Sequence, residues 1–231
     1  MDLNRYLHIL EVEKKELIVR GERSFIRDFY KSKSNLMVQK IEEKYRFFTQ
    51  DGAEFDLEES EALKLIEKLK NAEYYSTEVK DTEEIKTQDV LVLIQKMSFL
   101  SKDNRNYGTF AIRQKNGFVT TARSKVEGTM ETALVYDVNH TERRVYSNRK
   151  ASLNAPLMHL FLTYNPELNI FIHGHELTGQ IVHNSYEFPG TVGENVYARK
   201  VKSGQIIYLN EHGYIVGFRN IEEYKGFYEL E

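Results

Sequence analysis

The stretch Asn169-Ile170-Phe171-Ile172-His173-Gly174-His175 decides how the second half of this chain is interpreted. It predicts a β-strand, in which residues two apart point to the same side. Ile170 and Ile172 would then face a core, while His173 and His175 would project together from the other side, with Cα atoms about 6–7 Å apart. Two imidazoles at this spacing can bind one metal ion without distorting the backbone. The alternative is a strand with two polar residues at its solvent edge.

A third histidine could complete such a metal site. His212 ends a second predicted strand, at 205–210, and Gly213 after it permits close approach of the backbone. The chain contains no cysteine, so imidazole and carboxylate are the strong metal ligands it can offer. We therefore expect His173, His175 and His212 to hold a divalent metal ion at strand ends, where α/β folds commonly bind ligands. Zn²⁺ is the preferred ion among those that imidazole suits.

Strand and helix patterns alternate around this stretch. Short strand patterns occupy residues 108–113, 117–121, 133–138, 143–147 and 214–218. Apolar stripes and capping residues predict helices at 157–164, at 191–201 with Thr191 and Glu194 as a capping box, and from 220 onward. Strands interleaved with helices predict a layered α/β domain.

The first part of the chain has a different character. Tyr45–Gln50 and Ala53–Leu57 predict a hairpin around Asp51-Gly52, and the apolar stripe from 62 to 69 predicts a helix. Residues 71–87 are polar and typical of a linker. We place a domain boundary near residue 84, which gives a small αβ appendage at 1–84 and a main domain at 85–231.

Composition limits the classes of function. With 231 residues of which 41% are hydrophobic, the chain can build a sizeable core. The net charge of −3, from 32 basic and 35 acidic residues, does not favour a nucleic-acid partner. There is no apolar run long enough for a membrane span and no apolar segment typical of a signal peptide near the start. We expect a cytoplasmic protein without a nucleic-acid or membrane partner.

From about residue 87 to 231, the chain resembles the class II aldolase/adducin family. Six segments carry the resemblance in the family's order: 108–113, 117–124, 150–154, 164–175, 189–191 and 210–217. They include Gly108-Thr109-Phe110-Ala111-Ile112-Arg113 and Asn210-Glu211-His212-Gly213. The resemblance implies a three-layer αβα domain, usually a homotetramer, whose metal is held by three histidines at the positions of His173, His175 and His212.

The resemblance also implies a reaction and a set of residues. Family aldolases are lyases in which the metal polarises a small phosphorylated hydroxy-carbonyl compound and stabilises its enediolate. The matched substrate-binding positions are Thr109, Thr121, Arg123 and Ser152, and the candidate catalytic residues are Asn154, Tyr224 and Tyr228. His159 also matches a family histidine, although a core role is typical of a histidine on an apolar helix face.

One departure leaves the activity open. Asn154 occupies the position at which many family enzymes have an acid/base carboxylate, and an amide can orient a substrate but cannot transfer a proton. Tyr224 and Tyr228 could supply a phenol in its place. The alternatives are a catalytically inactive adducin-like module for assembly or binding, and a metal-dependent dehydratase of the same family, which would still need a carboxylate.

The N-terminal segment has its own, fainter resemblance. Glu16-Leu17-Ile18-Val19, residues 32–38 and the hairpin and helix that follow are similar to the C-terminal end of phosphopantothenoylcysteine synthetase. The nucleotide-binding body of that enzyme has no counterpart in this chain. The resemblance therefore implies an appendage for assembly, not ligase activity.

Overall fold

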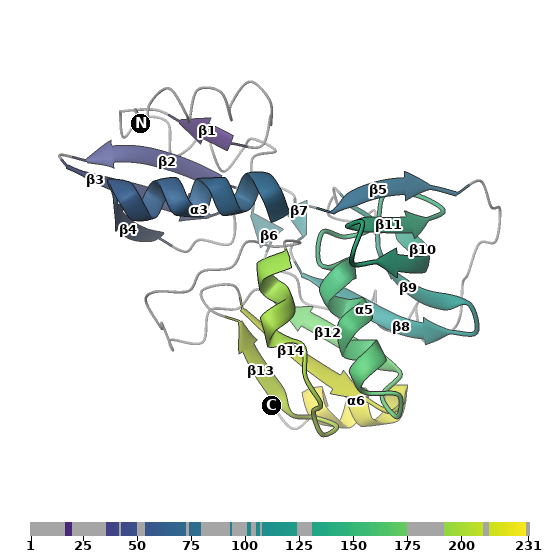
Figure 1. The fold of residues 1–231 in the computed structure, drawn as a ribbon. Coiled ribbons are helices and arrows are strands. Elements are labelled where there is room, and N and C mark those ends of the chain that lie inside the picture. Colours follow the sequence, from purple (N-terminus) through teal and green to yellow (C-terminus); the bar gives the residue numbers. More distant parts are fainter. Residues whose placement is uncertain are drawn as a thin grey trace. The chain divides into compact units, whose positions relative to one another are not determined.

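The computed structural model describes residues 17–19, 36–41, 43–49, 54–72, 74–79, 93, 101–102, 105–106, 108–123, 131–174, 192–209 and 213–229. The chain divides into two compact units, Met1–Ala72 and Glu73–Glu231. Their strands and helices are labelled in Figure 1. Each unit is described by itself.

The first unit contains a four-stranded sheet followed by a helix. The strands are β1 (Leu17–Val19), β2 (Leu36–Ile41), β3 (Lys44–Thr49) and β4 (Glu54–Glu58), in the order β1-β2-β3-β4, and the helix is α3 (Glu59–Ala72). β1 and β2 are parallel, whereas β2–β3 and β3–β4 are antiparallel pairs. The hairpin and the helix predicted in this part of the chain are confirmed.

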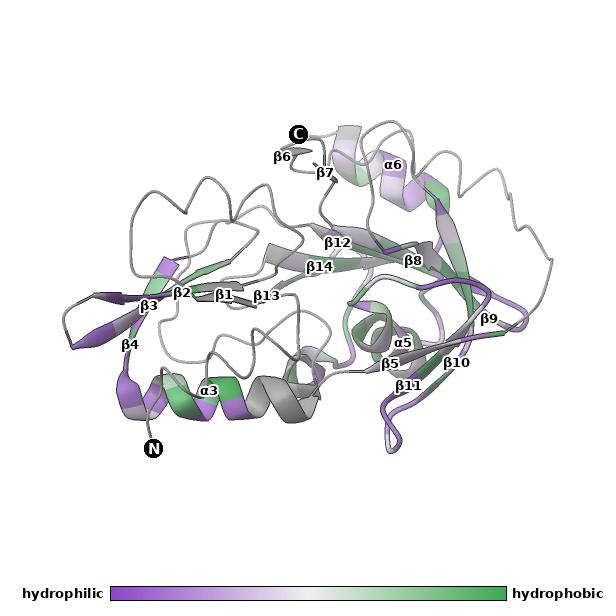
Figure 2. Cartoon of the chain, turned by 90° about the horizontal axis from the view of Figure 1, so that it is seen from above, coloured by the Kyte–Doolittle hydropathy of each residue, from purple (hydrophilic) through white to green (hydrophobic). Residues whose placement is uncertain are grey.

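Apolar and charged side chains alternate along the hairpin, and this pattern explains its pairing register. Phe47 lies opposite Phe55, and their rings stack with centroids 5.3 Å apart. Arg46, the neighbour of Phe47 in β3, points to the other face and forms two hydrogen bonds with Asp56, at 2.6 and 2.9 Å. In α3, the buried residues Ala62 and Ile66 are four positions apart, which places them on one face. Figure 2 shows hydrophobic and hydrophilic residues alternating along this helix.

The second unit is built on an eight-stranded mixed sheet. In the order of the sheet, its strands are β13 (Ile206–Leu209), β14 (Gly213–Phe218), β12 (Ile170–Gly174), β8 (Thr109–Gln114), β9 (Gly117–Thr121), β10 (Thr132–Asn139), β11 (Arg144–Ser147) and β5 (Tyr75–Glu78). All neighbours pair antiparallel except β11 and β5, which are parallel. A separate two-stranded ribbon joins β6 (Ser101–Lys102) to β7 (Arg105–Asn106). The predicted strands at 108–113, 117–121, 133–138, 143–147 and 214–218 are confirmed.

Helices cover both faces of this sheet. The helix α5 (Ala155–Tyr164) packs on the face that carries Phe171, with the Phe161 and Phe171 rings 5.4 Å apart. Ile170 and Ile172 point to the opposite face, where they share a core with the helix α6 (Ile221–Glu229). Figure 2 shows α5 and α6 on opposite sides of the strands. The chain is therefore a mixed α/β protein, and β12 is buried on both faces.

The structure differs from two sequence expectations. The segment expected to be a linker contains β5, which forms the edge of the large sheet, and the division between the units falls before it. β5 has the sequence YSTE, and its exposed edge position explains why it lacks the apolar pattern of an inner strand. The helix expected at 191–201 is a 3₁₀ helix, η2 (Val192–Tyr197). Val196 is 75% exposed, so this segment has no continuous apolar face on which to extend an α-helix.

Candidate functional site

Several predicted site residues meet at one end of the inner strands of the large sheet. β12 ends at Gly174, β9 ends at Thr121 and the antiparallel β8 begins at Thr109. His173 lies directly opposite Thr109 in the register of β12 and β8. The backbone N–H of Ser152 donates to the carbonyl of Thr121 at 2.9 Å, which brings the start of α5 to the same end.

His173 is held in one tautomer by its neighbouring strand. Its side chain is buried, and its Nδ1 lies 3.0 Å from the backbone carbonyl oxygen of Tyr214. A carbonyl can only accept, so Nδ1 carries the proton and Nε2 of the neutral ring carries the lone pair. Histidines that ligate metals are commonly oriented by this bond to a carbonyl. His173 therefore fits the part of a metal ligand that binds through Nε2.

The rest of the expected metal site falls outside the described residues. His175 and His212 are the two other predicted ligands, and neither belongs to the described ranges. Within those ranges, no group of three or more His, Asp or Glu side chains is placed to hold a metal ion. The set of three histidines stays a prediction, with one member placed.

The hydroxyl groups of three threonines form a cluster beside His173. Thr109 Oγ1 lies 3.0 Å from Thr120 Oγ1 and 2.6 Å from Thr121 Oγ1. All three side chains have an exposed fraction of 0%. The predicted substrate-binding residues Thr109 and Thr121 thus lie together, below the surface, where their mutual bonds fix the ends of β8 and β9.

Asn154 occupies the N-cap position of α5 without capping the helix. Its side chain makes no cap hydrogen bond, and the residue is only 4% exposed. In the described part of the chain, its Nδ2 has no hydrogen-bond partner. A buried donor left unpaired costs about 1–3 kcal/mol. This amide is therefore available to an acceptor atom of a ligand, near the positive end of the helix dipole.

A small cavity of about 10 Å³ lies next to the start of α5. Its polar lining consists of Tyr74, Ser76, Arg123 and Ser152, and its apolar lining of Val145, Ala151, Leu153 and Pro156. The lining contains no carboxylate. Arg123 and Ser152, two of the predicted substrate-binding residues, therefore meet at one cavity. Its volume suits a single oxygen atom or one water molecule.

The two candidate catalytic tyrosines lie on the other face of the sheet. Tyr224 is 2% exposed and packs edge-on against Phe218, with ring centroids 5.7 Å apart. Burial raises the pKa of Tyr224 to about 12. Tyr228 is bonded to Tyr214 through the two hydroxyls, at 3.1 Å. Neither tyrosine is brought to the cavity, and the surroundings of Tyr224 are those of a core residue.

Sequence reasoning missed two residues of this cavity and one of its neighbours. Tyr74 and Ser76 lie in the segment that was expected to be a linker, and His140 was given no role in the predicted site. Tyr74 OH lies 2.6 Å from His140 Nδ1, and His140 Nε2 lies 2.9 Å from His159 Nδ1. The one sequence signal was the match of His159 to a family histidine.

No helix among the described residues is long and apolar enough to cross a membrane. No protein-family model matches the sequence, and no curated protein matches it.

Two solved structures that resemble the chain are both YgbL, a candidate aldolase/epimerase/decarboxylase. The protein from Klebsiella pneumoniae aligns with a TM-score of 0.40 and 15% identity over 53% of this chain and 73% of that chain. The protein from Escherichia coli aligns with a TM-score of 0.44 and 15% identity over 62% of this chain and 81% of that chain. At such scores and identities, the likeness carries no conclusion about the activity of this chain.

Proposed function

We propose that the second unit, Glu73–Glu231, forms a three-layer class II aldolase-like domain that acts as a metal-dependent lyase. Its substrate is a small, phosphorylated hydroxy-carbonyl compound. His173, His175 and His212 hold a divalent metal, preferably Zn²⁺. The observation that carries this proposal is the meeting, at one end of the sheet's inner strands, of a tautomer-fixed His173 with the start of α5, where the buried donor of Asn154 lies.

The metal would supply Lewis acidity, which polarises a carbonyl and stabilises the negative charge that develops in an enolisation. The chain's own residues bind and orient the substrate. Arg123 is a charged donor for one oxygen of the phosphate, and the Ser152 hydroxyl at the same cavity adds a neutral donor. Asn154 offers its Nδ2 to a substrate oxygen, an interaction that would satisfy a donor without a partner among the described residues.

Metal content tests the ligand set directly. In the purified protein, His173→Ala, His175→Ala and His212→Ala should each lower the bound metal per chain, measured by elemental analysis after dialysis against a fixed Zn²⁺ concentration. His140→Asn is the matched control, because His140 is bonded to Tyr74 and His159. Unchanged metal content in all three alanine variants would contradict the proposed metal site.

A second function is favoured by one specific residue. Asn154 cannot accept a proton, which supports a catalytically inactive, adducin-like module for assembly or binding. Asn154→Glu separates the two functions under saturating metal. Enolisation of a hydroxyketone phosphate by the wild-type protein, or a gain in it in the variant, supports an active site, whereas no enolisation by either protein supports the binding module.

The assembly and location belong to the same proposal. We propose a homotetramer in the cytoplasm, with a small-molecule substrate as partner. Light scattering after size-exclusion chromatography measures the mass directly. A monomeric mass at micromolar concentration would contradict the tetramer and leave the metal site to be judged by its own test.

A further inference from the structure

The candidate site contains a half-buried chain of titratable side chains that no predicted role explains. Tyr74, which lines the cavity, is bonded to His140, and His140 is bonded to His159 on α5. Tyr74 also accepts a hydrogen bond from Asn195 Nδ2 at 3.1 Å. We call Tyr74, His140 and His159 the Tyr-His-His chain. It starts at the cavity wall and runs along the α5 face of the sheet.

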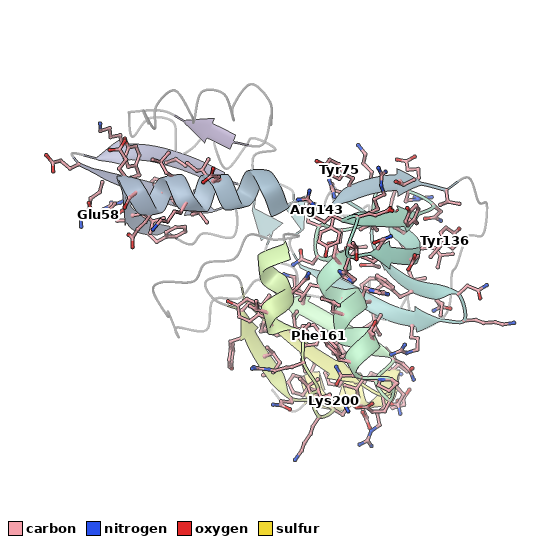
Figure 3. All side chains as sticks on the ribbon, in the orientation of Figure 1. Glu58, Tyr75, Tyr136, Arg143, Phe161 and Lys200 are labelled. Atoms are coloured by element: carbon pink, nitrogen blue, oxygen red, sulfur yellow. The ribbon has the colours of Figure 1, made fainter. Side chains whose placement is uncertain are left out.

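Packing holds the three rings in place. The Tyr74 ring meets the His140 ring edge-on, with centroids 5.6 Å apart and an interplanar angle of 84°. His140 and His159 stack at 5.1 Å, and His159 stacks in turn on Phe118 at 6.2 Å. The backbone supports the same arrangement, because Tyr75 N–H donates to the carbonyl of Arg143 at 2.7 Å. Figure 3 labels Tyr75 and Arg143 at this end of the sheet.

The bonds constrain where protons can be. The hydrogen bond between His140 Nε2 and His159 Nδ1 needs an N–H on one ring and a lone pair on the other. While this bond is present, the two rings together can carry at most one proton more than the neutral pair. When His140 Nδ1–H donates to the phenolic oxygen, the O–H of Tyr74 can be directed elsewhere, including toward the cavity. The chain can therefore pass a proton between His159 and the cavity.

This geometry meets a need of the proposed function, on which the inference rests. Enolisation requires a group that gives and takes a proton, and Asn154 cannot do so. Among the residues that line the cavity, Arg123 stays charged, and Ser76 and Ser152 have no imidazole partner among the described residues. Tyr74 is the lining residue that is bonded to an imidazole.

We propose that Tyr74 is the catalytic residue that transfers a proton to and from the enolised carbon of a substrate at the cavity, and that His140 and His159 restore its protonation state. As acid, Tyr74 breaks its O–H bond and the enediolate forms a C–H bond at carbon. The phenolate then takes the Nδ1 proton of His140, while His140 Nε2 takes the Nδ1 proton of His159. A His159 that began as an imidazolium ends neutral, so one proton has moved and no electrons are gained or lost. In the reverse direction the C–H bond breaks, Tyr74 takes its proton, and the relay leaves the extra proton on a previously neutral His159.

The groups around the Tyr-His-His chain shift the pKa values of its three members. Burial lowers the pKa of both His140 and His159, and the Asp137 carboxylate opposes this by favouring their charged forms. The two imidazoles also disfavour each other's charge. Burial raises the pKa of Tyr74, while the hydrogen bond from Asn195 and the charge of Arg143 act in the opposite direction. Tyr74 is thus neutral at ordinary pH and suited to act first as an acid.

The test measures exchange of carbon-bound hydrogen with D₂O in metal-loaded protein. Dihydroxyacetone phosphate and glycolaldehyde phosphate are the probes, followed by proton NMR. Tyr74→Phe keeps the ring but removes the hydroxyl, and should lower kcat for exchange by about a hundredfold or more with KM changed only a few-fold. His159→Asn keeps a donor near the Nδ1 position but cannot carry a second proton, and should remove the acidic limb of the pH–rate profile.

Metal content and the free energy of unfolding serve as controls, because neither should depend on proton transfer. Exchange in Tyr74→Phe at the wild-type rate would overturn the inference and leave the proposed function intact. Absence of exchange in the wild-type protein with both probes would overturn the proposed function and, with it, the catalytic role of Tyr74. In a readout that needs no substrate, imidazole ¹⁵N titrations should show the His140 midpoint shifting in Tyr74→Phe. An unchanged midpoint would overturn the relay.

Discussion

Two asparagines stand at the starts of helices and use their side chains differently. Asn220 accepts hydrogen bonds at Oδ1 from the N–H groups of Glu222 and Glu223, at 3.1 and 3.0 Å, and so caps α6. Asn154 has the same position before α5 and makes no such bond. Asn220 uses its side chain for stability, whereas the Nδ2 donor of Asn154 has no partner in the described part of the chain.

We predict opposite consequences for removing these two side chains. Asn220→Ala should lower the free energy of unfolding by about 1 kcal/mol, the usual value of an N-cap. Asn154→Ala should cost less than about 0.5 kcal/mol, because the loss of an unpaired donor offsets the lost packing. Denaturant unfolding of both variants measures the difference. A larger loss for Asn154→Ala than for Asn220→Ala would show that Asn154 is structural.

The pair His140 and His159 should make stability depend on pH. Burial lowers their pKa values below the ordinary 6.5 of histidine. Below about pH 6.5, the unfolded chain therefore binds protons that the folded chain does not, and the free energy of unfolding should fall with falling pH until the folded-state pKa values are reached. Above pH 6.5, the pair should add no pH dependence.

Denaturant unfolding between pH 5 and 8 tests this sign. The slope between pH 5 and 6.5 should be smaller in the double variant His140→Asn, His159→Asn than in the wild-type protein. An equal slope in both proteins would mean that the pair does not titrate differently on unfolding.

At the scale of elements, the turn between β8 and β9 depends on one glycine. Gly117 has a φ of 112°, and a Cβ built there would lie 1.9 Å from the carbonyl oxygen of Val135. The strand pairing between β9 and β10 leaves this position no space for a side chain.

Gly117→Ala should therefore destabilise the protein by at least ~2 kcal/mol. Gly226 in α6 is the matched control, because a Cβ there would meet nothing within 4 Å. Gly226→Ala should stabilise the protein by about 0.5–1 kcal/mol through helix propensity. Thermal unfolding of the two variants should thus shift in opposite directions, and a shared direction would contradict this account.

Elements with a strong apolar period were predictable, and those at the edges were not. Phe171 between Ile170 and Ile172 marks a strand that is buried on both faces, and Leu157 and Phe161 mark a helix face that packs on it. β5 carries no such signal, since an edge strand buries little and its pairing partner, β11, lies far along the chain. A sequence pattern reports local burial, and this pairing is non-local.

The residues of the candidate site were likewise predictable from the sequence only in part. Arg123 and Ser152 were predicted through their motifs and lie together, because both flank the same strand end and helix start. Tyr74 and His140 have no local motif, and only the sheet brings them into contact. The Tyr-His-His chain is therefore visible in three dimensions alone.

At the scale of the whole molecule, the boundary between the units predicts how the chain can be cut. A fragment of residues 73–231 keeps β5 and should unfold cooperatively. A fragment of 85–231 lacks β5 and Tyr74, exposes β11 as a new edge and should melt several degrees lower. Calorimetry of the two fragments measures this. Equal melting temperatures would show that β5 adds nothing to the second unit.

The parallel pairing of β5 with β11 also affects the order of assembly on the ribosome. β5 emerges well before β10 and β11, so it cannot take its place until most of the sheet has been synthesised. Tyr74, which directly precedes β5, can therefore reach His140 only after β10 and β11 have emerged. Since both strands precede β12, a nascent chain can join Tyr74 to His140 before the strand that bears His173 exists, and the proton donor would then be in place before a metal could be bound.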